Sequence, residues 1–319
     1  MSDIKKGIVH FWNLPSNVSI TLDSQFKTEL ITKFAKVTKN KSTSGLSRTT
    51  HNRYIGQKNT KFRLEFLLKI INAVDDEHFN LCEIEKHISC IGAPNSLGIT
   101  NPKIPFEFNS RQGARFLAAI CNEGWISDGM YYSNFDQGLR NSVKSDALFV
   151  FGGNENIIKE WIKIKDKYLA FPSIMRDVIV LITKFKGVKS ENNPPVPEVV
   201  FKNKEFMLGW IEQTIADEGC VKNYPETYRR EISWKRSFSK NLSSYNLAVG
   251  EYEMLNSTGI IYRTYIGDEY KTKKGKEKVR VQIRLTKKEN LLKLRRIIRI
   301  PHQRKDKIFT ELTNSFLGA

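Results

Sequence analysis

Phe116-Leu-Ala-Ala-Ile-Cys-Asn-Glu123-Gly124 is an apolar stretch of helical character, with small residues in its middle, that ends on a carboxylate followed by a glycine. Ile211-Glu-Gln-Thr-Ile-Ala-Asp-Glu218-Gly219 ends in the same way. A helix C-terminus already carries partial negative charge, so an acid in its last position is disfavoured. Two helices with this unfavourable ending indicate that Glu123 and Glu218 have a function.

Two carboxylates at neighbouring helix ends can share a cation. If the helices pack side by side through Ala118, Ala119 and Ala216, Glu123 and Glu218 meet at the bottom of the pair. A divalent metal keeps such carboxylates ionised, and Mg²⁺ binds through one or two carboxylates together with phosphate oxygens and water. The alternative is that both stretches are ordinary buried helices that end on C-cap glycines.

The two stretches resemble the LAGLIDADG motif of homing endonucleases, and the chain is similar to single-chain, two-motif members of archaeal type from residue 105 to residue 319. The resemblance implies an α+β fold with two pseudo-symmetric α/β repeats, whose saddle-shaped antiparallel sheets cover a long DNA site. It also implies that Glu123 and Glu218 hold Mg²⁺, for which Mn²⁺ or Ca²⁺ substitutes in binding. The backbone carbonyls of Asn122 and Asp217 are expected to add ligands.

The segment between the two stretches also carries the resemblance. Residues 190–197 are rich in proline, which predicts an extended connector, and the run Asn-Pro-Pro-Val-Pro resembles the inter-repeat segment of archaeal-type members. Gln213 and Thr214 stand where a small and an aliphatic residue are usual, so the helix contact there is expected to be looser or partly polar. The expected organisation is a small all-α domain, a first repeat, a linker and a second repeat: residues 1–95, 105–190, 191–203 and 204–319.

The charge of the chain favours a polyanionic partner. The 319 residues include 52 Lys+Arg and 34 Asp+Glu, a net charge of +18. Such a field attracts nucleic acid, because lysines and arginines that neutralise phosphates release condensed counterions. No apolar run has spanning length and no signal-peptide pattern begins the chain, so we expect an intracellular, cytoplasmic protein that does not bind membranes.

Cysteine and histidine side chains are possible metal ligands in this sequence. Cys121 and Cys220 lie next to the two motif acids and are expected to be small buried residues in a reducing compartment. A separate cluster has a spacing that matches no common zinc pattern, which favours a short helix with incidental ligands over a structural metal. That cluster contains His78, Cys82, His87 and Cys90.

The N-terminal region contains a helix-turn-helix-like pattern. Apolar residues at helical spacing follow the N-cap candidate Asp23, and a second amphipathic helix is expected over Leu64–Val74. Between them, Gly45-Leu-Ser-Arg-Thr-Thr-His-Asn-Arg-Tyr-Ile-Gly56 resembles a turn and recognition helix. The alternative is a small helical domain with a polar loop. The side chains expected to read base edges in the major groove are Arg48, Thr49, Asn52 and Arg53.

The first repeat is expected to alternate strands and helices after its motif. Aromatic residues predict a strand over 125–133, broken or bulged at Gly129, and a second strand over 139–150. Apolar residues then predict a helix over 157–164, and another helix after Pro172. The expected DNA contacts on the second strand are Arg140 and Lys144.

The second repeat is longer and more basic. Residues 271–307 contain sixteen Lys/Arg and three acids, which leaves +13 in this segment. Strands are expected over 229–239, 260–266 and 279–285, with a helix over 247–255. Alternation in the last strand places aliphatic residues on one face and polar residues on the other. The expected DNA contacts of this sheet and its basic turn are Lys235, Lys271, Lys273, Lys274, Lys276, Arg280, Gln282 and Arg284.

The sequence therefore predicts a monomeric, site-specific endonuclease that hydrolyses double-stranded DNA with Mg²⁺. A basic side chain near each metal often assists in this family, and Lys235, Arg280 and Arg284 are candidates. Two alternatives stay open. One is a DNA-binding regulator that has lost cleavage, and the other is an RNA-splicing maturase on the same scaffold.

Overall fold

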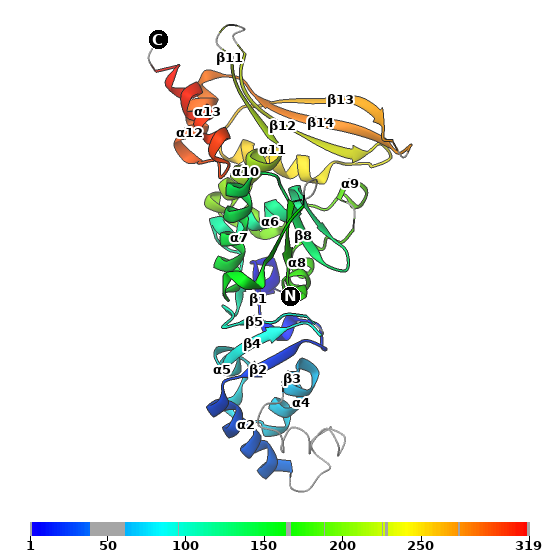
Figure 1. Ribbon diagram of the computed structural model, residues 1–319, viewed down its shortest axis with the longest axis vertical. Helices are drawn as coiled ribbons and strands as arrows, with labels where there is room; N and C mark the ends of the chain where they lie inside the picture. Colours follow the sequence, from blue (N-terminus) through cyan, green and yellow to red (C-terminus); the bar gives the residue numbers. More distant parts are fainter. Residues whose placement is uncertain are drawn as a thin grey trace.

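The computed structural model describes residues 2–38, 61–94, 96–163, 167–187, 189–224, 226, 229–273 and 275–317. The molecule is elongated, with the N-terminal part at one end and a strand-rich C-terminal part at the other (Figure 1). The expected α+β class is confirmed, since helices are combined with antiparallel sheets in the described residues. Within those residues, no helix is long and apolar enough to cross a membrane.

The N-terminal part is mixed rather than all-α, so that prediction was wrong. Its strands form an antiparallel sheet in the order β3-β2-β4-β5, on which α2 and α4 pack. These strands have two to five residues, too few to produce a clear alternation in the sequence. The elements are α1 (Ser2–Lys5), β1 (Ile8–Val9), β2 (Ser19–Leu22), α2 (Ser24–Val37), β3 (Phe62–Arg63), α4 (Leu64–Val74), α5 (Leu81–Lys86), β4 (Ile88–Gly92) and β5 (Ile99–Thr100).

Two helices of this part begin where the sequence predicted. The Asp23 side chain accepts a hydrogen bond from the Phe26 backbone N–H at 2.9 Å and caps α2, and α4 has the expected bounds. The N-terminal part is connected to the rest of the chain by strand pairing, because β1 pairs with β6 (Phe106–Glu107). The sheet also extends to β5, beyond the expected boundary at residue 95.

The first repeat differs from expectation in two elements. Residues 139–150 belong to helix α7 rather than a strand, because Asp136 caps its N-terminus and Leu139, Val143 and Ala147 recur at helical spacing in the core. The helix expected over 157–164 is wrong as well, since residues 159–162 within it form strand β9. After the motif helix α6 (Arg111–Asn122), the elements are β7 (Gly124–Ile126), β8 (Met130–Ser133), α7 (Gln137–Phe151), β9 (Lys159–Ile162), β10 (Lys167–Phe171) and α8 (Ser173–Thr183).

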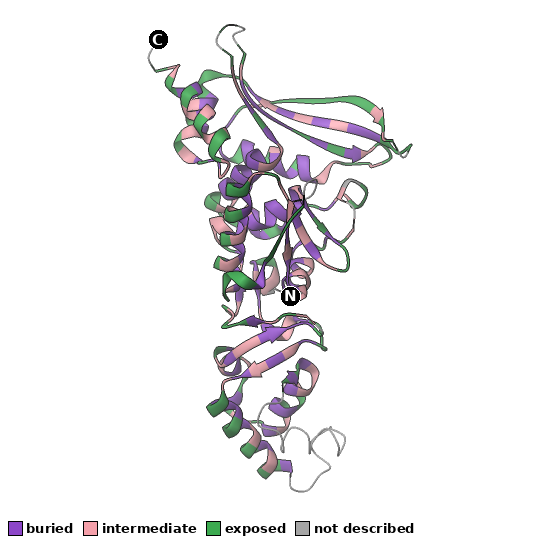
Figure 2. Ribbon diagram, viewed as in Figure 1, coloured by how far each residue is buried: buried purple, intermediate pink, exposed green. Residues whose placement is uncertain are grey.

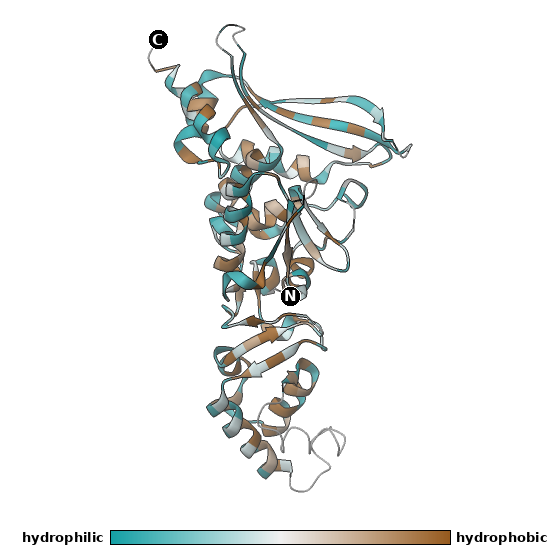
Figure 3. Cartoon of the chain, viewed as in Figure 1, coloured by the Kyte–Doolittle hydropathy of each residue, from teal (hydrophilic) through white to brown (hydrophobic). Residues whose placement is uncertain are grey.

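The second repeat follows the expectation more closely. Its sheet has the order β11-β12-β14-β13. In β14 the aliphatic residues are buried, whereas Arg280, Gln282 and Arg284 are half-buried. Figure 3 shows this alternation along the strands. The connector contains short helical turns on either side of an extended stretch. The elements are α9 (Lys189–Asn192), η5 (Glu198–Lys202), α10 (Lys204–Glu218), β11 (Gly219–Tyr224), β12 (Arg229–Ser239), α11 (Asn246–Ser257), β13 (Arg263–Lys271), β14 (Glu277–Leu285), α12 (Lys288–Ile297) and α13 (Gln303–Asn314).

The motif helices α6 and α10 lie side by side in the centre of the molecule and run parallel. Near their start, a Cβ on Gly209 would collide with the backbone oxygen of Arg111. At their end, the Asn122 amide donates to the Asp217 carboxylate at 3.1 Å. The alanines expected at the contact are buried, as Figure 2 shows for most of both helices. Parallel packing brings the two C-termini to the same place.

Both helices end in the same way. A Cβ on either Gly124 or Gly219 would lie closer than 3.0 Å to the carbonyl oxygen four residues earlier, that of Ile120 or Ile215. Only glycine avoids this clash, which explains why a glycine follows each acid. The strand that leaves each helix, β7 or β11, begins at that glycine.

Candidate functional site

The two motif acids lie at the joined C-termini of α6 and α10. Glu123 is the C-cap residue of α6, and Glu218 is the last residue of α10. The pKa of Glu123 is raised to about 7. Burial of its carboxylate is the largest cause, and the negative charge of Glu218 is the second. Asn122 and Asp217, the residues just before the two acids, are hydrogen-bonded to each other, so Glu123 and Glu218 lie near each other, as the shared-cation hypothesis requires.

A third acid, Asp217, lies beneath this pair. Its carboxylate accepts hydrogen bonds from the Tyr132 hydroxyl at 2.6 Å and from the side-chain amides of Gln213 and Asn122, both at 3.1 Å. Burial raises the pKa of Asp217 to about 6. Since Tyr132 and Asn122 come from the first repeat, this network ties the two repeats together below the acids. The Gln213 bond stays within α10, and the polar bond between the two helices is that of Asn122 with Asp217.

Two lysines that the sequence analysis missed reach the helix ends. The Lys189 ammonium donates to the Asn122 carbonyl, and the Lys305 ammonium donates to the Ala216 carbonyl at 2.6 Å. Burial lowers the pKa of both lysines, although the negative charges of Glu218 and the other nearby acids act in the opposite direction and raise it. Each motif helix thus has a half-buried lysine at its C-terminus, where cations are favoured.

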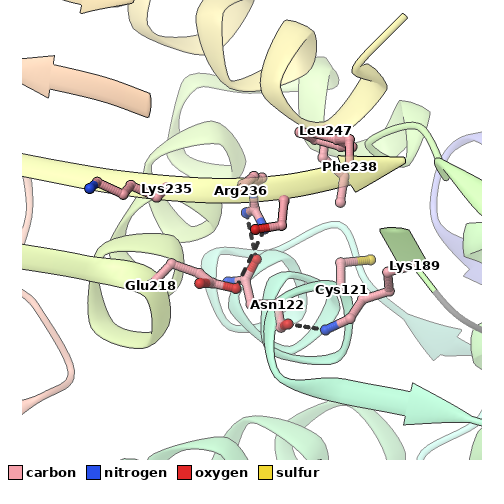
Figure 4. A pocket seen from close by; sticks show the side chains of 9 residues that line it. Cys121, Asn122, Lys189, Glu218, Lys235, Arg236, Phe238 and Leu247 are labelled. Carbon is pink, nitrogen blue, oxygen red and sulfur yellow. Dashed lines mark hydrogen bonds and ion pairs between the residues drawn. The ribbon is translucent and has the colours of Figure 1, made fainter. Parts of the chain in front are cut away.

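Arg236 on β12 links the acids to the core. Its guanidinium binds the fully buried Glu251, donates to the Asn122 side-chain oxygen at 2.6 Å and lies 3.9 Å from the Glu218 carboxylate. Figure 4 shows Arg236 and Lys189 on different sides of Asn122. These groups line a cavity of ≈ 260 Å³ that includes Cys121, Asn122, Lys189, Glu218, Lys235, Arg236, Ser237, Phe238 and Leu247.

The donor set fits a divalent cation only in part. The carboxylates of Glu123 and Glu218 fit, because Mg²⁺ accepts two neighbouring carboxylates as ligands and Glu218 lines the open cavity. The carbonyls expected as further ligands have other partners. That of Asn122 binds Lys189, and that of Asp217 lies 3.5 Å from the Lys305 ammonium. The side-chain carboxylates are therefore the better candidate ligands.

Several residues expected to contact DNA share one face of the second sheet. In the register of β12, β13 and β14, Lys235 lies opposite Gln282, and Arg263 lies opposite Arg284. This face is not purely basic, because Arg284 pairs with the buried Glu231. In the turn, Lys271 lies 3.5 Å from Glu277, Lys276 pairs with Glu191, and Lys273 is exposed. Lys274 lies outside the described residues, while Arg280 lies 3.8 Å from Asp268 and over the ring of Tyr270.

Arg140 and Lys144 do not form part of a DNA-binding strand, contrary to expectation. Both lie on α7. Arg140 is 2% exposed and donates to Glu160 at 2.7 Å, and the Lys144 ammonium lies 3.4 Å from Glu155. The error follows from the assignment of this segment as a strand, since the helix turns Arg140 into the interior.

The recognition-helix candidates Arg48, Thr49, Asn52 and Arg53 lie outside the described residues. Of the histidine and cysteine cluster, His87 has Asp23 as a partner at 2.6 Å, His78 lies 3.7 Å from Glu29, Cys90 is half-buried and Cys82 is exposed. Among the described residues, no group of three or more His, Cys, Asp and Glu has a metal-binding arrangement. Cys121 is buried as expected, whereas Cys220 is exposed.

Comparison with models of known protein families gives no match to this chain, and comparison with curated proteins gives none either.

The raised pKa of Glu123 predicts a stability that depends on pH. The folded protein retains this proton between the usual value of 4.5 and about 7, so stability falls as pH rises through that window. Relative to wild type, Glu123→Gln should gain about 2 kcal/mol at pH 8 and nothing below pH ~4, allowing for partial exposure. Urea unfolding in metal-free buffer with chelator measures the difference. A difference that does not change with pH would contradict the prediction.

Proposed function

We propose that the chain is a metal-dependent DNA endonuclease of the LAGLIDADG homing type, which binds a long duplex site as a monomer. The observation that carries the proposal is the meeting of Glu123 and Glu218 at the C-termini of two parallel helices. The matching glycine at each helix end and the antiparallel sheet after each motif helix support it. The net charge of +18 favours the same ligand.

In this proposal the described residues have separate roles. Glu123 and Glu218 hold Mg²⁺, which when bound lowers the pKa of a water molecule and stabilises the leaving oxygen. Lys189 and Lys305 are placed to neutralise phosphate oxygens beside the acids. Asp217, held by three hydrogen bonds, fixes the two helix ends at one distance.

A DNA-binding regulator without cleavage is the second candidate. The observation in its favour is that Lys189, Lys305 and Arg236 already place positive charge next to the acids. Such neighbours reduce the repulsion between Glu123 and Glu218 in the absence of a metal. Glu218 lines the open cavity and lies 3.9 Å from Arg236, at the outer limit of an ion pair, so its carboxylate is accessible to a metal, which favours the enzyme.

The test is incubation of the full chain with a randomised library of duplex DNA and Mg²⁺, followed by sequencing of cut ends. We expect ends enriched at one long sequence motif, and no enrichment when a chelator is present. If the same library yields a bound motif but no cut ends, the regulator is the correct reading. Binding without any sequence preference would contradict both candidates.

A further inference from the structure

The open face of the first sheet carries a row of aromatic rings. In the strand register, Trp125 on β7 lies opposite Tyr131 on β8, and Trp161 on β9 lies opposite Tyr168 on β10. Alternation places all four on the same face, opposite the core residues Met130, Tyr132 and Leu169. The row therefore crosses the whole width of the sheet.

The four rings contact one another in sequence. Trp125 and Tyr131 stack with centroids 4.7 Å apart, Tyr131 meets Tyr168 edge-on at 5.7 Å, and Trp161 lies nearly parallel to Tyr168 at 6.2 Å. Between them is an open hollow of ≈ 410 Å³, lined by Trp125, Ser127, Tyr131, Ser133 and Tyr168. Mutual contact holds the rings in place before any ligand arrives, which reduces the entropy lost on binding.

The rings are accessible to a partner. Trp125 is 38% exposed and Trp161 is 45% exposed. One exposed aromatic residue is normal on a protein surface, but a contiguous group of them marks a binding site. The stability of the fold does not require these rings, because the opposite face of the sheet supplies the core.

The charge of this face fits a polyanion. Lys159 lies on the same face as Trp161, and Lys163 follows two residues after it; both are exposed. Within the four strands, all of which the structure describes, this face carries no carboxylate. Glu160 lies on the other face, where it pairs with Arg140. Flat rings bordered by lysines combine the two features that bind bases and phosphates without a base-pairing partner.

We propose that these four rings, Trp125, Tyr131, Tyr168 and Trp161, stack the unpaired bases of a nucleic-acid strand. Stacking needs bases that are free of their own duplex neighbours, so the ligand is a single-stranded segment rather than the duplex of the proposed cleavage reaction. The inference goes beyond that reaction and does not require the acids. It shares with the proposed function only the class of ligand, a polynucleotide.

The test measures binding of short fluorescent oligonucleotides by anisotropy, with chelator present so that cleavage plays no part. The probes are oligothymidylate, oligouridylate and an abasic DNA chain with the same number of phosphates. Trp161→Ala should weaken binding to at least one of the two base-containing probes about tenfold, and Trp161→Phe should restore most of it. Binding to the abasic chain should not change.

Ile162→Ala is the matched control, because Ile162 is 63% exposed on the opposite face of the same strand. It should leave all three affinities as in wild type. The relative affinity of the wild-type protein for oligothymidylate and oligouridylate shows whether the natural ligand is DNA or RNA. The proposal is overturned if Trp161→Ala behaves like Ile162→Ala, or weakens the abasic chain equally. It is also overturned if Trp161→Ala leaves oligonucleotide binding unchanged and alters only the self-association measured by sedimentation. The aromatic face would then bind a second copy of the chain. Loss of duplex cleavage in the library experiment would leave this result unaffected.

Discussion

Glu123→Gln is expected to lower the rate of metal-dependent strand cleavage on the order of 10³-fold, with the affinity for duplex DNA unchanged. Glutamine has the shape of glutamate but no charge, so the helix end keeps its geometry and loses a metal ligand. Several kcal/mol of transition-state stabilisation depend on that ligand. Removal of the buried charge and of its repulsion with Glu218 should also make the folded protein about 2 kcal/mol more stable at pH 8.

The experiment compares nicking and DNA binding of the same preparations. Glu218→Gln should behave like Glu123→Gln, because the two carboxylates lie at the joined C-termini of α6 and α10 and are the two proposed metal ligands. Glu253→Gln is the control, since it makes the same change on an exposed part of α11. Cleavage by Glu123→Gln at the wild-type rate, in the presence of Mg²⁺, would show that this acid is not a metal ligand.

The position of the two acids could be predicted from the sequence because their signal is local. Each copy is an apolar helix that ends on an acid and a glycine. In both copies the glycine has a physical explanation, which is its short distance to the carbonyl four residues earlier. The alternation in β14 is also a local signal, and its faces were assigned correctly. The assignment of residues 139–150 failed because an amphipathic helix and a mixed strand both contain apolar residues at short intervals.

The residues around the acids could not be predicted, since they are brought there by packing between distant segments. Lys189 belongs to the connector and Lys305 to the last helix, and neither has a sequence pattern that separates it from a surface lysine. Tyr132 is different, because its inward position follows from alternation with Met130. Its hydrogen bond to Asp217 depends on the contact between repeats and gave no signal. The aromatic row depends on the pairing of four strands, one of which was expected to be a helix.

Arg236→Met is expected to destabilise the fold by about 3–4 kcal/mol, the largest effect that we predict for a single substitution outside the acids. Arg236 is 7% exposed and its partner Glu251 is fully buried. Burial alone would lower the pKa of Arg236, but Glu251 more than offsets it, so the guanidinium stays charged. Without the guanidinium, the hydrogen bonds that Glu251 keeps within the described part of the chain are those from the Trp234 indole at 2.8 Å and the Thr214 hydroxyl at 3.5 Å. These neutral donors do not compensate a buried charge.

Urea unfolding followed by circular dichroism measures this loss. The control is Lys240→Met just after the same strand, where the ammonium pairs with Glu269 at 2.6 Å but both side chains are largely exposed. Exposed pairs contribute little, so no measurable change is expected there. The double variant Arg236→Met/Glu251→Leu should recover part of the stability, because the unpaired charge is removed with its partner. If the double variant is no more stable than Arg236→Met, the loss comes from packing, and the ion pair is not what holds β12 to α11.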